Sequence, residues 1–129
     1  MNTERVKYWT ELSDYDLETA EAMLKGGRFL YVAFMCHQSI EKALKAYWCG
    51  TKTDNPPYVH NLNRLAEGCG LAESFNETQQ DFIDEMIPMN IEARYPSYKE
   101  HLLNALSEQK CKEMIDNTKS LLIWIKDRL

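Results

Sequence analysis

The strongest constraint on the fold is the spacing of the apolar residues, which recur every three or four positions between glycine and proline breaks. This spacing places apolar side chains on one face of an α-helix, whereas a strand would require strict alternation. We find no convincing alternating run in the 129 residues. The sequence therefore predicts an all-α protein, and its length suits one compact domain over residues 1–129.

The breaks divide the chain into an up-and-down bundle of four to five main helices with short extra helices. The first helix is expected over Thr3–Lys25, with Gly26 as its terminating C′ residue. The second is expected over residues 29–49, with Gly50 stopping it. The last should run from its cap, Ser107, to the C-terminus. The stripe of this last helix contains Cys111, Met114, Ile115, Thr118, Leu122, Ile125 and Leu129.

The middle of the chain predicts shorter helices and one proline break. Asn61 is a plausible N-cap for a helix over residues 62–67, and Asn76 is a plausible N-cap for a fourth helix. Pro88 lies within that fourth helical pattern and removes one backbone hydrogen bond. We therefore expect a kink at Pro88, with the helix resuming to about Arg94.

Charge and hydropathy narrow the functional classes. The net charge of −5 argues against a broad, non-specific nucleic-acid binder, although a local basic groove needs only a few well-placed cations. No segment approaches the roughly 18–20 apolar residues that span a bilayer. The N-terminal sequence "MNTERVKYW" has no apolar signal-peptide core. These features favour a cytoplasmic protein with no membrane partner.

The residues that usually hold metals and cofactors form no recognisable pattern. The four cysteines match no zinc spacing, and Cys36 and Cys111 fall on apolar helical stripes, which predicts buried free thiols rather than disulfides. The three histidines are dispersed and lack an acidic partner at ligand spacing. A GxxxxGK phosphate loop is absent. We expect no metal site and no cofactor.

Three ordered segments of the sequence carry a family resemblance. "YVAFMCHQSIEKALKAYW", residues 31–48, is similar to the second helix of HEPN domains. "PPYVHNLNRL", residues 56–65, resembles the family segment that follows it, and "ARYP", residues 93–96, resembles the signature near the end of the fourth helix. With the length and the helix count, the resemblance covers nearly the whole chain. It indicates a small, stand-alone member that contains Arg-Tyr-Pro.

The resemblance implies a set of alternative functions. The first is a nucleotide- or RNA-binding module that acts with a nucleotidyltransferase partner. The second is a metal-independent endoribonuclease, the toxin of a toxin–antitoxin pair, whose mark is an arginine, four to six residues, and a histidine. The third is a non-catalytic interaction protein or antitoxin. Family members commonly dimerise, so the resemblance also implies a homodimer.

Arg94 and His101 fit the ribonuclease mark at its longest spacing. A histidine transfers protons near neutral pH, and an arginine binds a phosphate through a bidentate fork. The residue after the arginine is usually small and polar in the ribonuclease members, but here it is Tyr95. Catalysis, ligand binding by Arg94, and a purely structural role, in which His101 caps a helix or packs against the core, all remain open.

The backbone between these two residues should bend. Tyr95 precedes Pro96, which disfavours a helical backbone at Tyr95. "SYKE" reads as a capping box, with Ser97 as the N-cap and Glu100 at the third helical position. A new helix that starts there would place His101 about one turn inside it. Arg94 and His101 would then flank the bend, and both could point into one groove.

The second helix carries the remaining binding candidates, Gln38, Glu41, Lys42 and Lys45. Their simplest interpretation is a solvated helix face, with Glu41 and Lys45 four apart in the favourable order for an ion pair. The family resemblance favours the alternative that some of them line a ligand groove. Gln38, one turn before Lys42, would then bond a base or ribose, and the nucleotide- or RNA-binding set would also include Arg94 and Tyr95.

The other two histidines have structural interpretations. His37 lies on the apolar side of the second helix and is predicted to be a core histidine. His60 matches a position of the resembled segment, but its place just before a short helix favours a role in fixing that loop.

Overall fold

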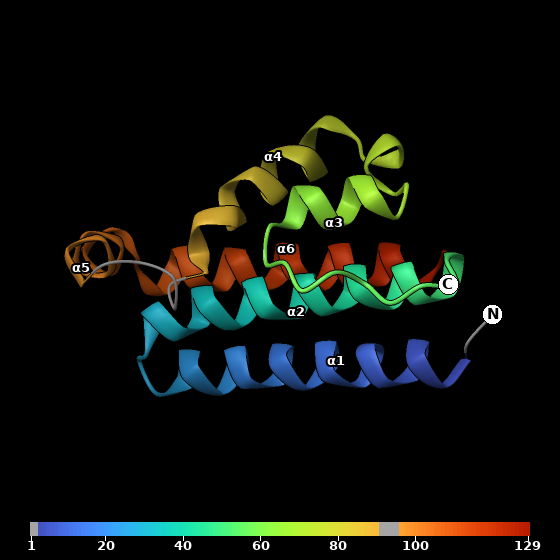
Figure 1. Ribbon diagram of the computed structural model, residues 1–129. Coiled ribbons are helices and arrows are strands. Elements are labelled where there is room, and N and C mark those ends of the chain that lie inside the picture. The colour runs from blue at the N-terminus through green and yellow to red at the C-terminus, as the bar shows by residue number, and fades with distance from the viewer. Residues whose placement is uncertain (1–2, 91–95) are drawn as a thin grey trace.

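The structure, a computed structural model, describes residues 3–90 and 96–129, and within these ranges all regular structure is helical (Figure 1). This confirms the all-α prediction and the helical bundle. The elements are α1 (Thr3–Lys25), α2 (Phe29–Thr51), α3 (Leu62–Gly68), the 3₁₀ turn η1 (Ala72–Ser74), α4 (Glu77–Met86), the 3₁₀ turn η2 (Ile87–Met89), α5 (Pro96–Ala105) and α6 (Glu108–Lys126).

Helix α2 is the centre of the bundle (Figure 1). It lies antiparallel along α1, packs against α6 and α3, and also contacts α4, η2 and α5. The loop that follows α2 runs back along it to reach α3, while α5 lies at the opposite end of the bundle from the C-terminus. No described helix is long and apolar enough to cross a membrane.

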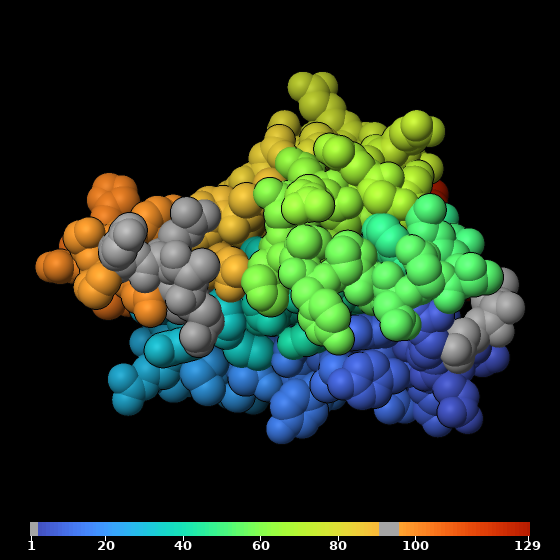
Figure 2. All heavy atoms as spheres, in the orientation of Figure 1, coloured from blue at the N-terminus to red at the C-terminus, as the bar shows by residue number. Residues whose placement is uncertain are grey.

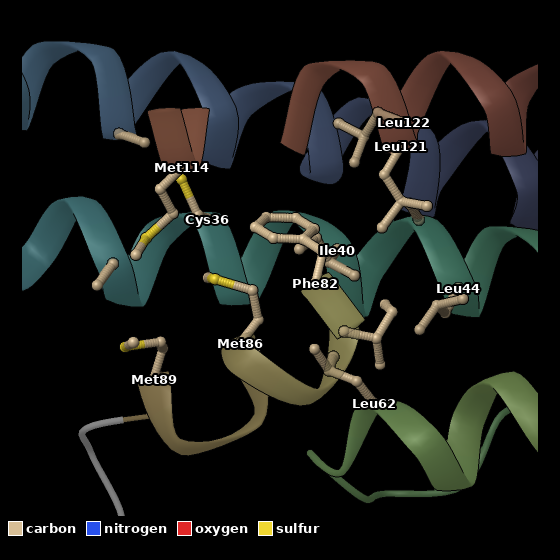
Figure 3. Close-up of a cluster of buried hydrophobic side chains, with 14 of the residues drawn as sticks. Cys36, Ile40, Leu44, Leu62, Phe82, Met86, Met89, Met114, Leu121 and Leu122 are labelled. Carbon is tan, nitrogen blue, oxygen red and sulfur yellow. The ribbon is translucent and has the colours of Figure 1, made fainter. Parts of the chain in front are cut away.

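The core forms where a stripe of α2 meets α3, α4 and α6 (Figure 3). Cys36, Ile40 and Leu44 are spaced four apart and are fully buried. They face Phe82 and Met86 of α4 and three side chains of α6. Those α6 side chains are Met114, Leu121 and Leu122. A spacing of four positions keeps these three side chains on one face of the helix, so the periodicity in the sequence directly predicts this packing.

The predicted stripe of the last helix is buried from Cys111 to Ile125, which confirms its orientation. Leu129 is exposed because α6 ends at Lys126, three residues before the end of the chain. All four cysteines are buried free thiols, as predicted for Cys36 and Cys111. Burial raises the pKa of the Cys36 thiol to about 12. This thiol therefore stays protonated at neutral pH and behaves as a small apolar side chain.

The predicted N-caps are confirmed. Asn61 accepts a hydrogen bond from the third backbone amide of α3, and Ser107 does the same for α6. Asn76 forms a reciprocal capping box with Gln79 at the start of α4. These polar side chains satisfy amides that the helix itself leaves unpaired, which explains why helix starts could be located from the sequence.

The end of α1 differs by one residue from the prediction. The C′ residue is Gly27, whose φ is +71°, and not Gly26. The Gly27 amide donates to the Leu24 carbonyl at 3.1 Å, and the Arg28 amide donates to the Met23 carbonyl at 2.8 Å. This pair of bonds is a Schellman motif, and its left-handed residue favours glycine. The two adjacent glycines made the register ambiguous.

Gly50 does not stop α2, which continues to Thr51. A glycine inside a helix costs about 1 kcal/mol relative to alanine, which packing of a long helix readily offsets. A Cβ at this position would lie 3.5 Å from Leu129 and 3.6 Å from Val6, in ordinary van der Waals contact. Side chains distant in sequence thus lie beside this last turn of the helix, and the local sequence pattern does not reveal them.

We expected α4 to continue through a kink at Pro88, but within the described residues it does not. Helix α4 ends at Met86, Pro88 lies in the 3₁₀ turn η2, and Asn90 leaves helical geometry with ψ near 73°. A proline is tolerated in the first turn of such an element because its missing donor would be unpaired there. The expected resumption toward Arg94 falls on residues 91–95, outside the described residues.

The capping box predicted at "SYKE", with Ser97 as the N-cap, is also wrong. Helix α5 spans Pro96–Ala105, so Ser97 lies inside the helix rather than in front of it. Pro96 is helical because a proline fits the first turn of a helix without a donor. The backbone of Tyr95 lies outside the described residues.

Two glycine substitutions test the packing at the ends of α2 and α3. A Cβ on Gly68 would lie 2.5 Å from Cζ3 of Trp48, whose indole nitrogen donates to Asp54 at 3.1 Å. Because that ring is anchored, we expect Gly68→Ala to lower the free energy of unfolding by about 1–3 kcal/mol in urea denaturation. Gly50→Ala is the matched control and should raise it by up to about 1 kcal/mol. Equal stability of Gly68→Ala and the unsubstituted protein would contradict the packing described.

Candidate functional site

The best candidate for a functional site is a polar cluster on α2, which we call the Glu41 cluster and define as His37, Glu41, Lys45 and His60. The side chains of Glu41 and Lys45 are only 3% and 8% exposed. The interpretation of these two residues as a solvated helix face is therefore wrong. In the space-filling view, the segment from α2 to α3 lies over part of α2, and α1 lies beside it (Figure 2). The small exposed fractions of Glu41 and Lys45 show that both charges are largely removed from water.

The Glu41 carboxylate has a partner on each of its oxygens. Its Oε2 accepts a hydrogen bond from Lys45 Nζ at 3.0 Å, which confirms the predicted ion pair. Its Oε1 lies 3.0 Å from His60 Nδ1 and 4.0 Å from His37 Nδ1. Lys45 Nζ also lies 5.2 Å from the centre of the Trp9 ring of α1. Buried charges need such partners, because an unpaired one would cost several kcal/mol.

His37 is the neutral member of the cluster, and its complete burial confirms the prediction of a core histidine. Burial lowers its pKa to about 4, and the nearby Glu41 carboxylate partly offsets that effect. Its Nδ1 lies 3.4 Å from the Gln38 amide nitrogen. Its Nε2 has no hydrogen-bond partner among residues 3–90 and 96–129. The backbone of His60 also acts on this imidazole and raises its pKa, so His37 lies against the loop before α3.

His60 is the exposed member of the cluster. Its side chain is 63% exposed, although Nδ1 is bound to the buried carboxylate. When Nδ1 carries the proton and donates it to Glu41, Nε2 holds a free lone pair. The contact connects the loop before α3 to α2, which agrees with the expected role of His60 in fixing that loop. It also fixes an imidazole that can exchange a proton with a ligand.

Gln38 and Lys42 belong to a second polar set, at the contact between α1 and α2. Lys42 Nζ donates to the Asp16 carboxylate and lies 3.5 Å from the Gln38 carbonyl oxygen. Beside this pair, Ser13 and Ser39 exchange hydroxyl-to-carbonyl hydrogen bonds of 2.7 and 2.8 Å. Sequence reasoning missed Asp16, and only its position on the buried side of α1 would have indicated a role. The Lys42 ammonium thus already has an anionic partner.

The predicted Arg94–His101 pair is only half described. His101 lies on α5 with an exposed side chain, so it does not pack against the core. Arg94 and Tyr95 lie outside the described residues. His60 belongs to the loop before α3, whereas His101 belongs to the helix at the end of the bundle (Figure 1).

A cavity of about 460 Å³ lies between α4 and α6, and no sequence pattern had indicated it. Phe82, Leu121 and Trp124 supply its apolar walls, and Asp81 and Glu85 lie among its polar lining. Its size is in the range of small-molecule sites, which is about 300–1,000 Å³. Among the described side chains, no group of three or more His, Cys, Asp or Glu is arranged to hold a metal ion.

The comparisons with known proteins agree with the fold. The model of the HEPN domain matches residues 6–128, so the chain belongs to the HEPN domain family. The crystal structure of TT1696 from Thermus thermophilus superposes with a TM-score of 0.82 at 18% identity, covering 97% of this chain and 98% of that one. At that identity the likeness shows the fold alone. No curated protein matches the sequence significantly.

The buried state of His37 predicts a pH-dependent stability. In the unfolded chain this imidazole takes up a proton as the pH falls below its usual pKa of 6.5, but in the folded protein it does so only near pH 4. The contribution of neutral His37 to the free energy of unfolding is therefore fully present above pH 6.5, and it is lost as the pH falls toward 4. The loss amounts to about 3 kcal/mol.

We expect His37→Gln to reduce the difference in unfolding free energy between about pH 7 and about pH 4.5, measured by urea denaturation at each pH. His101→Gln, which removes an exposed histidine, is the matched control and should leave the difference in place. If the pH dependence of stability is the same in His37→Gln as in the unsubstituted protein, then His37 is not held in its neutral form by folding, and the prediction is contradicted.

Proposed function

We propose that the protein is a nucleotide- or RNA-binding module whose ligand site is centred on the Glu41 cluster. The observation that carries this proposal is the exposed imidazole of His60 bound to a buried, ion-paired carboxylate. Replacing a buried ion pair by apolar residues is often neutral or stabilising, so its presence in the interior suggests a purpose other than stability. Clusters of this kind are typical of functional sites. Membership of the HEPN family supports the same ligand class.

The charges of the cluster suit a phosphate when His60 is protonated. The Lys45 ammonium neutralises the Glu41 carboxylate at 3.0 Å, so the carboxylate does not repel an approaching anion. The His60 imidazolium then leaves one positive charge on the exposed side. In this proposal the guanidinium of Arg94 supplies a second phosphate contact, and Tyr95, Gln38 and Lys42 complete the binding set. A few local cations are sufficient on a protein whose net charge is −5.

The proposal also includes protein partners. Family membership supports a nucleotidyltransferase as the protein with which this module acts. It also supports a homodimer, for which the exposed aromatic side chains of Tyr8 and Tyr15 on α1 offer contact area. Aromatic residues with a polar end are enriched in such interfaces.

A second candidate function is a metal-independent endoribonuclease that uses Arg94 and His101. The exposure of His101 on α5 favours it, because a proton-transferring histidine must reach its substrate. The third alternative, a non-catalytic interaction protein or antitoxin, requires no ligand at all.

The binding proposal is tested with a fluorescently labelled single-stranded RNA and with a panel of nucleotides, each titrated at two salt concentrations. His60→Ala removes a charge-assisted hydrogen bond, so we expect about a tenfold loss of affinity measured by fluorescence anisotropy. Arg94→Ala should weaken binding by a similar factor. Lys112→Ala, which removes an exposed cation of α6, is the matched control and should leave the dissociation constant nearly unchanged.

Absence of binding by the unsubstituted protein to every nucleotide and RNA would contradict the proposal and favour the non-catalytic alternative. Binding that is equally strong in His60→Ala and Arg94→Ala would place the ligand elsewhere on the molecule.

A further inference from the structure

We propose that the cavity between α4 and α6 binds a small organic amine, with its ammonium group at Asp81 and its apolar body against Phe82 and Trp124. The ligand class is a primary ammonium group attached to an aromatic or aliphatic body. The cavity lies on other elements than the Glu41 cluster. The inference therefore goes beyond the proposed function and does not depend on it.

Two antiparallel helices form the walls of the cavity. On each helix the lining residues lie mostly three or four positions apart, which places them on one face. Glu85, near the end of α4, pairs with Lys110, near the start of α6, at 2.6 Å. Beyond the other end of α4, the ring centre of Phe75 lies 5.5 Å from that of Trp124, near the end of α6. These two contacts bridge the helices, and the volume of about 460 Å³ between them suits a small molecule.

The inner surface of the cavity is apolar and partly aromatic. Phe82 and Leu121 are buried members of the core cluster (Figure 3), and the Trp124 ring is half-buried beside them. The Arg128 guanidinium lies 3.6 Å from the centre of the Trp124 ring. This ring therefore already attracts a cation, as the negative face of an indole does. The walls favour a ligand that combines an apolar body with a positive charge.

The charge of the α4 wall also favours a cation. Residues 71–90 contain five carboxylates and no lysine, arginine or histidine, so this segment carries a charge of −5. That value equals the net charge of the whole chain, and the other residues have as many acidic as basic side chains, 15 of each. The uneven distribution concentrates negative potential on the α4 side, where it attracts an amine and repels a phosphate.

Asp81 is the carboxylate that we assign to the ligand. The cavity lining contains two carboxylates, of which Glu85 is already paired with Lys110. The exposed Asp81 makes no hydrogen bond or ion pair with any residue of 3–90 or 96–129. An ammonium group therefore gains a partner at Asp81 without breaking an existing pair. Because Phe82 follows Asp81 directly, the charged and apolar parts of the site are adjacent.

The proposal is tested with three probes of similar size and different charge, each titrated into ¹⁵N-labelled protein and followed by NMR. The probes are the cation 2-phenylethylamine, the neutral 2-phenylethanol and the anion phenylacetate. We expect the amine to cause saturable shifts that are largest on the cavity faces of α4 and α6. The alcohol should bind about fivefold more weakly, and phenylacetate should not saturate. Added salt should weaken binding of the amine and not of the alcohol.

Asp81→Asn tests the assigned ammonium contact, and because Asp81 is exposed this variant should fold. We expect the dissociation constant of the amine to rise about fivefold and that of the alcohol to stay unchanged. Asp116→Asn, which removes an exposed carboxylate of α6 outside this cavity, is the matched control. It should change the dissociation constant of the amine by less than about twofold. Ser120→Phe fills the cavity from an exposed position and should abolish binding of both probes.

The other outcomes overturn the inference. The absence of saturable binding by the amine would show that the cavity is not a site, and it would leave the proposed function intact because the experiment contains no RNA. Equal affinity for the amine and the alcohol would show an apolar pocket without selection by charge. Unchanged affinity for the amine in Asp81→Asn would remove the ammonium contact from this residue and with it the assigned site.

Discussion

The Glu41 carboxylate, bound by Lys45 on one oxygen and His60 on the other, is the interaction on which our account of this molecule depends. It connects the central helix α2 to the loop that runs back along it, and so fixes where α3 begins. Removing one partner of a buried pair typically costs about 3–5 kcal/mol, whereas apolar residues in place of the whole pair are often neutral or stabilising. The cluster thus makes the fold depend on buried charges, and the ligand site that we propose there accounts for their presence.

The fold follows from local rules to a large extent. Helix starts were located well because Asn61, Asn76 and Ser107 bind amides of their own helices, an interaction encoded within four residues. Helix ends were located less well. Gly50 was expected to end α2, but the helix continues for two more residues, to Thr51. The side chains of Val6 and Leu129 lie close to Gly50, and such tertiary proximity is invisible in a local window. The 3₁₀ turn at Pro88 and the helical position of Ser97 were missed because a proline fits the first turn of a helical element, where its missing donor would be unpaired.

The candidate site was predictable only in part. The spacing of Glu41 and Lys45 indicated their ion pair, but not its burial, because a helix with charged residues on one face is usually solvated there. The contact between Glu41 and His60 joins residues 19 apart, and it depends on the path of an irregular loop that has no periodic pattern. The same applies to the pairing of Lys42 with Asp16 across two helices. The family resemblance marked these segments, whereas the structure shows which of their side chains meet.

The most direct test of this account is a map of backbone amide chemical shifts in a ¹⁵N-labelled sample titrated with the single-stranded RNA of the binding experiment. A ligand site at the Glu41 cluster predicts that the largest changes fall on His37, Glu41, Lys45 and His60, and that they saturate with one dissociation constant. Changes confined to the α4–α6 cavity around Phe82 and Trp124, with the cluster unaffected, would contradict it.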